Sequence, residues 1–111
     1  MESKVEVVQE QNGVIQVAAS VRGNKSPCVK NVYIYHVFEG KMITDWQIFL
    51  NEGRMDFCVN QFTYPNVPPH YSLAGNPRPL KEGNVYNVSV TGVGFVGEEE
   101  FTRIKLPSKT P

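Results

Sequence analysis

The sequence lacks most of the features that mark a membrane protein or a nucleic-acid-binding protein. No apolar run approaches the roughly 20 residues that a membrane-spanning helix needs, and no signal peptide pattern opens the chain. Eleven basic and eleven acidic side chains cancel. Because phosphate binding needs an excess of basic surface, we expect no nucleic-acid partner.

Motifs for metal binding and catalysis are also missing. There is no C-x-x-C pair, and the two histidines, His36 and His70, stand alone in the sequence, so we expect no metal site. His36 alternates with apolar residues, which is typical of a sheet histidine rather than a general base. The glycine-rich run 92–97 lies between two predicted strands, whereas a phosphate-binding loop precedes a helix. The sequence therefore predicts no cofactor and no enzymatic activity.

Helical periodicity is weak throughout, and apolar residues instead recur at every second position. Seven such runs are separated by turn signals such as Asn12-Gly13 and Gly83-Asn84, at a spacing of roughly ten residues. This pattern predicts one domain, residues 1–111, folded as an antiparallel immunoglobulin-like or fibronectin-III-like β-sandwich of about seven strands. Residues 30–38 are rich in β-branched and aromatic residues on both faces and predict a central strand. The alternation predicts four sets of residues that share a face: Ile15, Val17, Ala19 and Val21; Trp46, Ile48 and Leu50; Met55, Phe57 and Val59; and Tyr86, Val88 and Val90.

A local motif supports the same fold near the end of the chain. Leu80, Gly83 and Tyr86 have the L-x-x-G-x-x-Y spacing of a tyrosine corner. In such a corner the ring packs inward and the hydroxyl bonds to the backbone a few residues upstream. The alternative is a tyrosine that simply alternates inward in a sheet. Either arrangement concerns architecture and not chemistry.

The two cysteines, Cys28 and Cys58, are an even number in a small β-rich chain, and we expect them to form a disulfide. The bond would close a loop of about 30 residues. The alternative is a pair of separate buried thiols, each acting as a small hydrophobic residue.

Residues 60–79 interrupt the strand pattern. This segment holds five of the eight prolines, and a proline cannot donate to a β-ladder, so we predict a long loop. Its aromatic residues allow two interpretations. They form a protein-binding surface, or they cap the sandwich edge where the chain crosses from one sheet to the other. The residues concerned are Phe62, Tyr64, His70 and Tyr71.

The acidic run Glu98, Glu99 and Glu100 is expected at a hairpin, as a solvated turn. Its second interpretation is a surface that attracts a basic partner. Too few oxygen ligands accompany it for a calcium site.

Three segments give the chain a resemblance to a family of small bacterial lipoproteins described as immunity proteins of type VI secretion systems. A cysteine leads into an early strand in "SPCVKNVYIYHVF", and a second cysteine closes "MDFCV". The pair "PLKEGNVYNVSVTG" and "EEFTRIKL" follows. The lipid-bearing cysteine of that family has no counterpart here, and we expect it upstream of residue 1.

The resemblance implies a function, a compartment and a set of contact residues. The protein would be a periplasmic monomer that binds a toxic protein effector stoichiometrically and without a cofactor. Aromatic and arginine side chains would anchor the contact, since these dominate binding hot spots. The candidates are Phe62, Tyr64, His70, Tyr71 and Arg78.

Other interpretations remain beside this one. The chain could be an immunoglobulin-like module of a larger surface or secreted protein, as the polar segment "PSKTP" fits a linker. It could also be an accessory domain of a phage particle. Both alternatives are binding or structural roles that need no catalytic residues.

Overall fold

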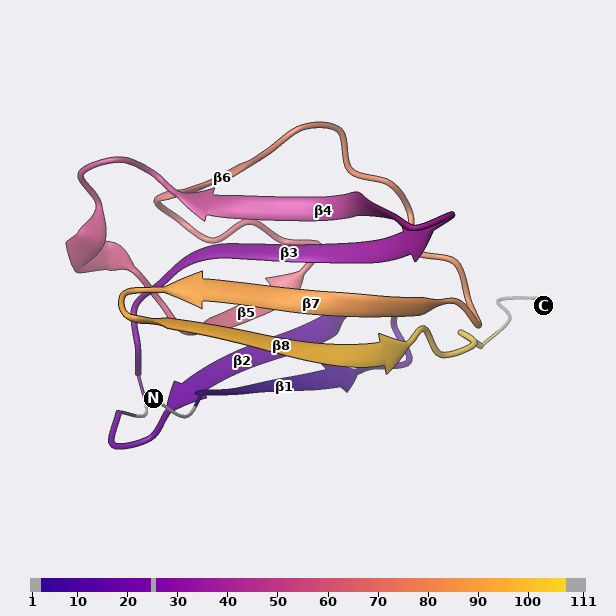
Figure 1. Ribbon diagram of the computed structural model, residues 1–111, viewed down its shortest axis with the longest axis horizontal. Coiled ribbons are helices and arrows are strands. Elements are labelled where there is room, and N and C mark those ends of the chain that lie inside the picture. The colour runs from indigo at the N-terminus through magenta and orange to yellow at the C-terminus, as the bar shows by residue number, and fades with distance from the viewer. Residues whose placement is uncertain (1–2, 25, 108–111) are drawn as a thin grey trace.

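Two antiparallel β-sheets make up the fold in the computed structural model, which describes residues 3–24 and 26–107 (Figure 1). One sheet has three strands in the order β1-β2-β5, and the other has five in the order β6-β4-β3-β7-β8. The predicted antiparallel sandwich is therefore confirmed, with eight strands instead of seven. The strands are β1 (Ser3–Gln9), β2 (Ile15–Val21), β3 (Val29–Phe38), β4 (Lys41–Leu50), β5 (Gln61–Tyr64), β6 (Tyr71–Leu73), β7 (Val85–Gly92) and β8 (Phe95–Thr102); a 3-10 turn, η1 (Met55–Phe57), precedes β5.

The core lies between the two sheets and is built mainly from β-branched residues. Alternation places every second side chain of a strand on the inner face, as predicted for β2, β4 and β7. β3 lies between β4 and β7, as predicted for a central strand. Burial of each Ile or Val side chain contributes about 1.5–3 kcal/mol. The side chains with no exposed surface are Ile15, Val29, Val32, Ile34, Ile48, Val88 and Val90.

The prediction of a strand at Met55–Val59 is wrong. Residues 55–57 form η1, where the Phe57 N–H donates to the Arg54 carbonyl at 2.9 Å. Met55, Phe57 and Val59 are all exposed instead of sharing a buried face. The Val29 N–H donates to the Val59 carbonyl at 3.2 Å, but among the described residues no strand forms a ladder with residues 55–59, so their alternation has no sheet to act on.

The prediction of one long loop at residues 60–79 is also wrong. The segment contains β5, which pairs with β2, and β6, which pairs with β4. The chain therefore crosses from the smaller sheet to the larger one between β5 and β6, as in the second interpretation of this segment. The five prolines were a poor guide because all of them lie outside the two short strands.

The acidic run lies within a strand and not at a turn. Glu98, Glu99 and Glu100 are consecutive exposed residues of β8. The hairpin turn falls at residues 93–94, between the end of β7 and the start of β8. β8 is an edge strand of the larger sheet, where charged side chains are well tolerated.

The tyrosine corner is present at the start of β7. The Tyr86 hydroxyl accepts a hydrogen bond from the Lys81 N–H at 2.8 Å, and only 2% of the residue is exposed. Gly83 has a φ of +82°, a conformation that glycine adopts at no steric cost. Leu80 packs against the core. The corner thus fixes the entry of the chain into β7.

Side chains join the edge strands β1 and β8 along one side of the sandwich. The Ser3 hydroxyl donates to the Val96 carbonyl at 2.6 Å, and the Gln9 amide donates to the Thr102 carbonyl at 2.7 Å. Gly97 permits this approach, since a Cβ there would meet Val5 Cγ2 at 2.7 Å. The two sheets are therefore linked along this edge without a backbone ladder.

Replacing Tyr86 with Phe removes the hydroxyl that satisfies the Lys81 N–H. We expect the free energy of unfolding to fall by about 1 kcal/mol, the usual contribution of one such hydrogen bond. Chemical denaturation measures the change. Tyr33→Phe is the matched control, because the Tyr33 hydroxyl makes no hydrogen bond within the described part of the chain. Equal stability of Tyr86→Phe and the parent would contradict a stabilising role for the corner.

Candidate functional site

Two of the predicted contact residues lie in the core. Phe62 is 2% exposed and Tyr71 is 6% exposed. Their rings meet edge to face, with centroids 5.5 Å apart. The prediction that these two side chains anchor a partner is wrong, because their strands turn them inward between the sheets.

The other three predicted contact residues lie in three different surroundings. The half-buried Tyr64 packs edge to face on Trp46, with ring centroids 5.2 Å apart, and burial raises the pKa of Tyr64. The His70 ring stacks on the Phe57 ring, with ring centroids 4.0 Å apart. Arg78 is exposed, and its backbone N–H donates to the Asp45 carbonyl at 2.7 Å. The predicted set does not form one surface.

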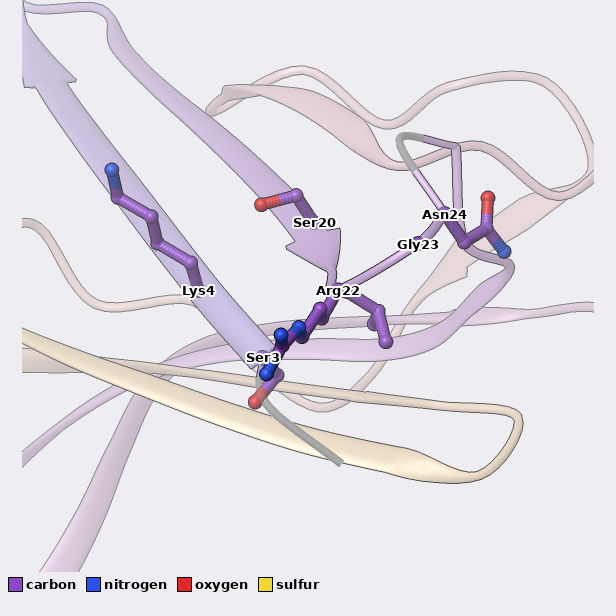
Figure 2. A pocket seen from close by; sticks show the side chains of 7 residues that line it. Ser3, Lys4, Ser20, Arg22, Gly23 and Asn24 are labelled. Carbon is purple, nitrogen blue, oxygen red and sulfur yellow. The ribbon is translucent and has the colours of Figure 1, made fainter.

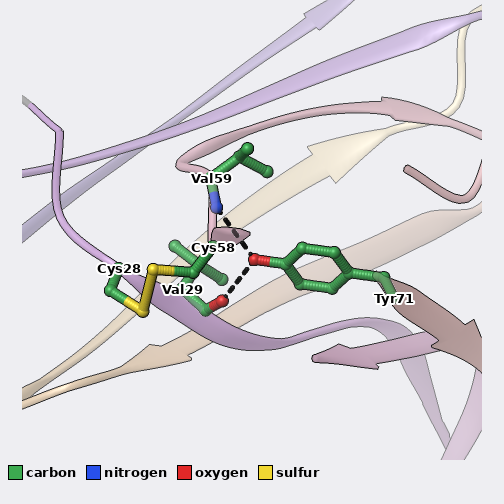
Figure 3. Close-up of a disulfide and its surroundings, with 5 residues drawn as sticks. All are labelled: Cys28, Val29, Cys58, Val59 and Tyr71. Carbon is green, nitrogen blue, oxygen red and sulfur yellow. Dashed lines mark hydrogen bonds between the residues drawn. A yellow bond between two sulfur atoms is a disulfide. The ribbon is translucent and has the colours of Figure 1, made fainter. Parts of the chain in front are cut away.

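A disulfide fixes one end of the sandwich. Cys28 and Cys58 are bonded, with Cα atoms 5.3 Å apart, as the cysteine count predicted. Beside this bond the Tyr71 hydroxyl accepts from the Val59 N–H at 3.0 Å and donates to the Val29 carbonyl at 2.6 Å (Figure 3). Burial raises the pKa of Tyr71. The larger sheet and the segment leading to β5 are thus held together at this end.

The fixed segment carries exposed apolar side chains, and we call residues 54–59 the apolar knob. Met55 is 45% exposed and Phe57 is 51% exposed. The His70 ring lies against Phe57, and His70 itself has a φ of +68°. The knob is therefore held from two sides, by the disulfide at Cys58 and by the stacked imidazole.

A cavity of about 470 Å³ connects the knob to the larger sheet. Met55 lines one side of it, and Asn31, Gln47 and Phe49 of the sheet line the other. Phe49 is 37% exposed. The knob and this corner of the outer sheet face thus form one continuous surface.

The outer face of the larger sheet carries two neighbouring tyrosines. The Tyr33 and Tyr35 ring centroids are 5.8 Å apart. The Tyr35 hydroxyl donates to Glu98, and this hydrogen bond raises the pKa of Tyr35 to about 12. The register places Phe49 opposite Asn31 on the same face. Aromatic side chains therefore extend from the knob across this sheet.

The Arg103 side chain is a buried cation beside the turn between β1 and β2. Arg103 is 6% exposed, and its Nη2 donates to the Gly13 carbonyl at 2.9 Å. Its Nε and Nη1 have no hydrogen-bond partner among the residues that the structure describes. Its charge also acts on Tyr64, lowering the pKa of that phenol against the larger effect of burial. Arg103 joins the β1–β2 hairpin to the end of β8.

A hollow of about 730 Å³ lies where β1 begins and β2 ends. Lys4 and Arg22 line it, but the Lys4 ammonium is 3.0 Å from Glu6 and points away from Arg22 in Figure 2. The two cations do not converge on one point. This hollow gives no basis for a binding site.

The described residues include no group of three or more His, Cys, Asp or Glu side chains that could hold a metal ion. His36 Nδ1 forms a hydrogen bond with Asp45 Oδ2 at 2.7 Å.

Sequence reasoning missed both the His36–Asp45 pair and the knob. Two features of the sequence indicated that this segment is not a buried strand. One is the polar turn Asn51-Glu52-Gly53-Arg54, and the other is the charged residue Asp56 within the apolar run.

Comparison with family models, curated proteins and solved structures found no match to this chain. The resemblance to immunity lipoproteins therefore stays a prediction.

Replacing Tyr71 with Phe tests the hydrogen-bonded link beside the disulfide. The change leaves the Val59 N–H and the Val29 carbonyl without their partner, and we expect the free energy of unfolding to fall by about 1–3 kcal/mol. Denaturation alongside Tyr86→Phe gives the comparison, since that hydroxyl makes one bond and the Tyr71 hydroxyl makes two. A smaller loss in Tyr71→Phe than in Tyr86→Phe would contradict this role.

Removing the disulfide tests the covalent link. The two cysteines are 30 residues apart, and the chain-entropy model gives about 3–4 kcal/mol of stabilisation for a loop of that length. We expect Cys28→Ala with Cys58→Ala to lose that amount in urea denaturation under oxidising conditions. Under reducing conditions the parent should match the double variant. A parent that keeps its full stability when reduced would overturn the expectation.

Proposed function

We propose that this chain is a non-enzymatic protein-binding domain that works outside the cytoplasm, with the apolar knob as its main contact. The observation that supports this most directly is the exposure of Met55 and Phe57 on a segment that is fixed by the Cys28–Cys58 disulfide and the His70 ring. Exposed apolar groups on a rigid segment are typical of contact surfaces rather than of solvated loops.

Rigidity matters for affinity as much as exposure does. A loop that orders when it binds loses conformational entropy, and this loss is subtracted from the binding free energy. The knob is already ordered by its covalent link and by the stacked ring, at a centroid distance of 4.0 Å. Most of the free energy released when Phe57 and Met55 leave water therefore contributes to binding.

The surface beside the knob fits the same purpose. The cavity between Met55 and Phe49 can accept one partner side chain, and Tyr33 and Tyr35 provide flat aromatic area beyond it. Aromatic residues are enriched at the centres of protein interfaces. Glu98, at the edge of this face, favours a partner with basic residues at the corresponding rim.

The proposed compartment follows from the disulfide. Disulfides persist in oxidising environments such as the bacterial periplasm and are rare in the cytosol. Among the described residues there is no helix with the length and apolarity to span a bilayer. The resemblance makes the proposal more specific, because it implies a periplasmic immunity protein that neutralises a toxic effector by stoichiometric binding.

Affinity capture tests this function. The oxidised domain serves as bait for a cell extract of its native organism, and captured proteins are identified by mass spectrometry. We expect one protein in equimolar amount that is toxic when expressed alone and harmless when co-expressed with this chain. Capture of surface or cell-wall components in its place would favour the structural or adhesion module.

Variants of the knob connect the captured partner to the proposed surface. Phe57→Ala should weaken binding by about 30-fold or more, the size of a hot-spot loss of 2 kcal/mol. Its unfolding free energy should change by less than about 1 kcal/mol, because half of the residue is exposed. Val8→Ala is the matched control, since Val8 is 57% exposed on the smaller sheet. Equal loss of binding in both variants would place the contact elsewhere.

A further inference from the structure

A cavity of about 310 Å³ lies at the opposite end of β3 from the disulfide. Three basic residues line it, His36, Arg78 and Lys81, together with Asp45, Asn84 and Tyr86. None of these residues belongs to the knob or to the tyrosine face.

The histidine in this cavity has a fixed orientation. Its Nδ1 is 2.7 Å from Asp45 Oδ2, and the Asp45 side chain is only 4% exposed. The ring meets Tyr86 edge to face, with centroids 5.8 Å apart. Because Asp45 occupies Nδ1, the Nε2 atom is the one left to bind another group.

The two cations are carried on backbone that is itself anchored at the cavity. The Arg78 N–H donates to the Asp45 carbonyl at 2.7 Å, and the Lys81 N–H donates to the Tyr86 hydroxyl at 2.8 Å. Within the described residues, neither the Arg78 guanidinium nor the Lys81 ammonium makes a hydrogen bond or an ion pair. Both residues line the same cavity, and their charged groups are not engaged by another described residue.

Asp45 does not cancel the charge of this cavity. Its carboxylate is turned to His36 and hydrogen-bonds Nδ1, so Nε2 is the ring nitrogen that can donate to a ligand when both nitrogens carry protons. The charged and titratable groups around the imidazole are Asp45 from β4, Tyr86 from β7, and Arg78 and Lys81 from the segment between β6 and β7. Cations outnumber the single carboxylate.

We propose that this cavity binds an oxyanion, a carboxylate or a phosphate group, through His36 Nε2 and the side chains of Arg78 and Lys81. A guanidinium donates two parallel hydrogen bonds to such a group, and an ammonium adds a point charge. The site is a second one and does not depend on the protein-binding role of the knob.

Nuclear magnetic resonance titration tests the site. Inorganic phosphate and succinate are added separately to the oxidised protein at pH 6, with sodium chloride at equal ionic strength as the reference. We expect saturable shifts of the His36 imidazole and of the Lys81 and Asn84 amides. Saturation by phosphate alone identifies a phosphoryl ligand, and saturation by succinate alone identifies a carboxylate. Chloride shifts equal to those of both probes would overturn the proposal.

Charge variants give the second arm of the test. Arg78→Gln and Lys81→Gln should each weaken binding by about tenfold, the loss expected for one charge-assisted hydrogen bond. Both residues are exposed, so the remaining amide shifts should stay those of the parent. Lys30→Gln is the matched control, as it removes one exposed positive charge away from the cavity. Unchanged affinity in Arg78→Gln and Lys81→Gln, or an equal loss in Lys30→Gln, would overturn the assignment.

Discussion

The surface features at one end of this molecule depend on the joint between its two sheets. Cys28 directly precedes β3 of the larger sheet, and Cys58 lies in the segment that leads to β5 of the smaller one. The Tyr71 hydroxyl repeats this link with two hydrogen bonds, to the residues that follow the two cysteines. Because a core of this size supplies only modest stability, a covalent joint has a large influence. The joint also determines where the segment between β4 and β5 lies.

That segment has few internal interactions of its own. Its single 3-10 turn is three residues long and has no buried residue. An isolated turn of this kind would be mobile in solution. Fixed at Cys58 and covered by the His70 ring, it can instead present Met55 and Phe57 in one arrangement. The disulfide therefore links the stability of the fold to the shape of its exposed surface.

The sequence predicted the parts of the fold that depend on local pattern. The inner faces of β2, β4 and β7 could be predicted because each strand has one buried face, which produces regular alternation. The tyrosine corner could be predicted from three residues within seven positions. The knob was missed, since its alternation looks like that of a strand, and the disulfide and the His70 ring that hold it come from distant positions in the sequence. The positions of Phe62 and Tyr71 were missed because their short strands are recognisable only once β2 and β4 are in place beside them.

The joined edge between β1 and β8 has a consequence for how copies of this chain meet. Unpaired backbone groups on an edge strand are the usual point at which a strand from another molecule adds and starts an aggregate. Here the Ser3 and Gln9 side chains occupy the Val96 and Thr102 carbonyls, and three consecutive glutamates lie between them on β8. An added strand would have to displace those bonds and place its own backbone beside three negative charges. This edge is therefore protected against fibril growth by side chains alone, which matters most where a protein accumulates in a confined space.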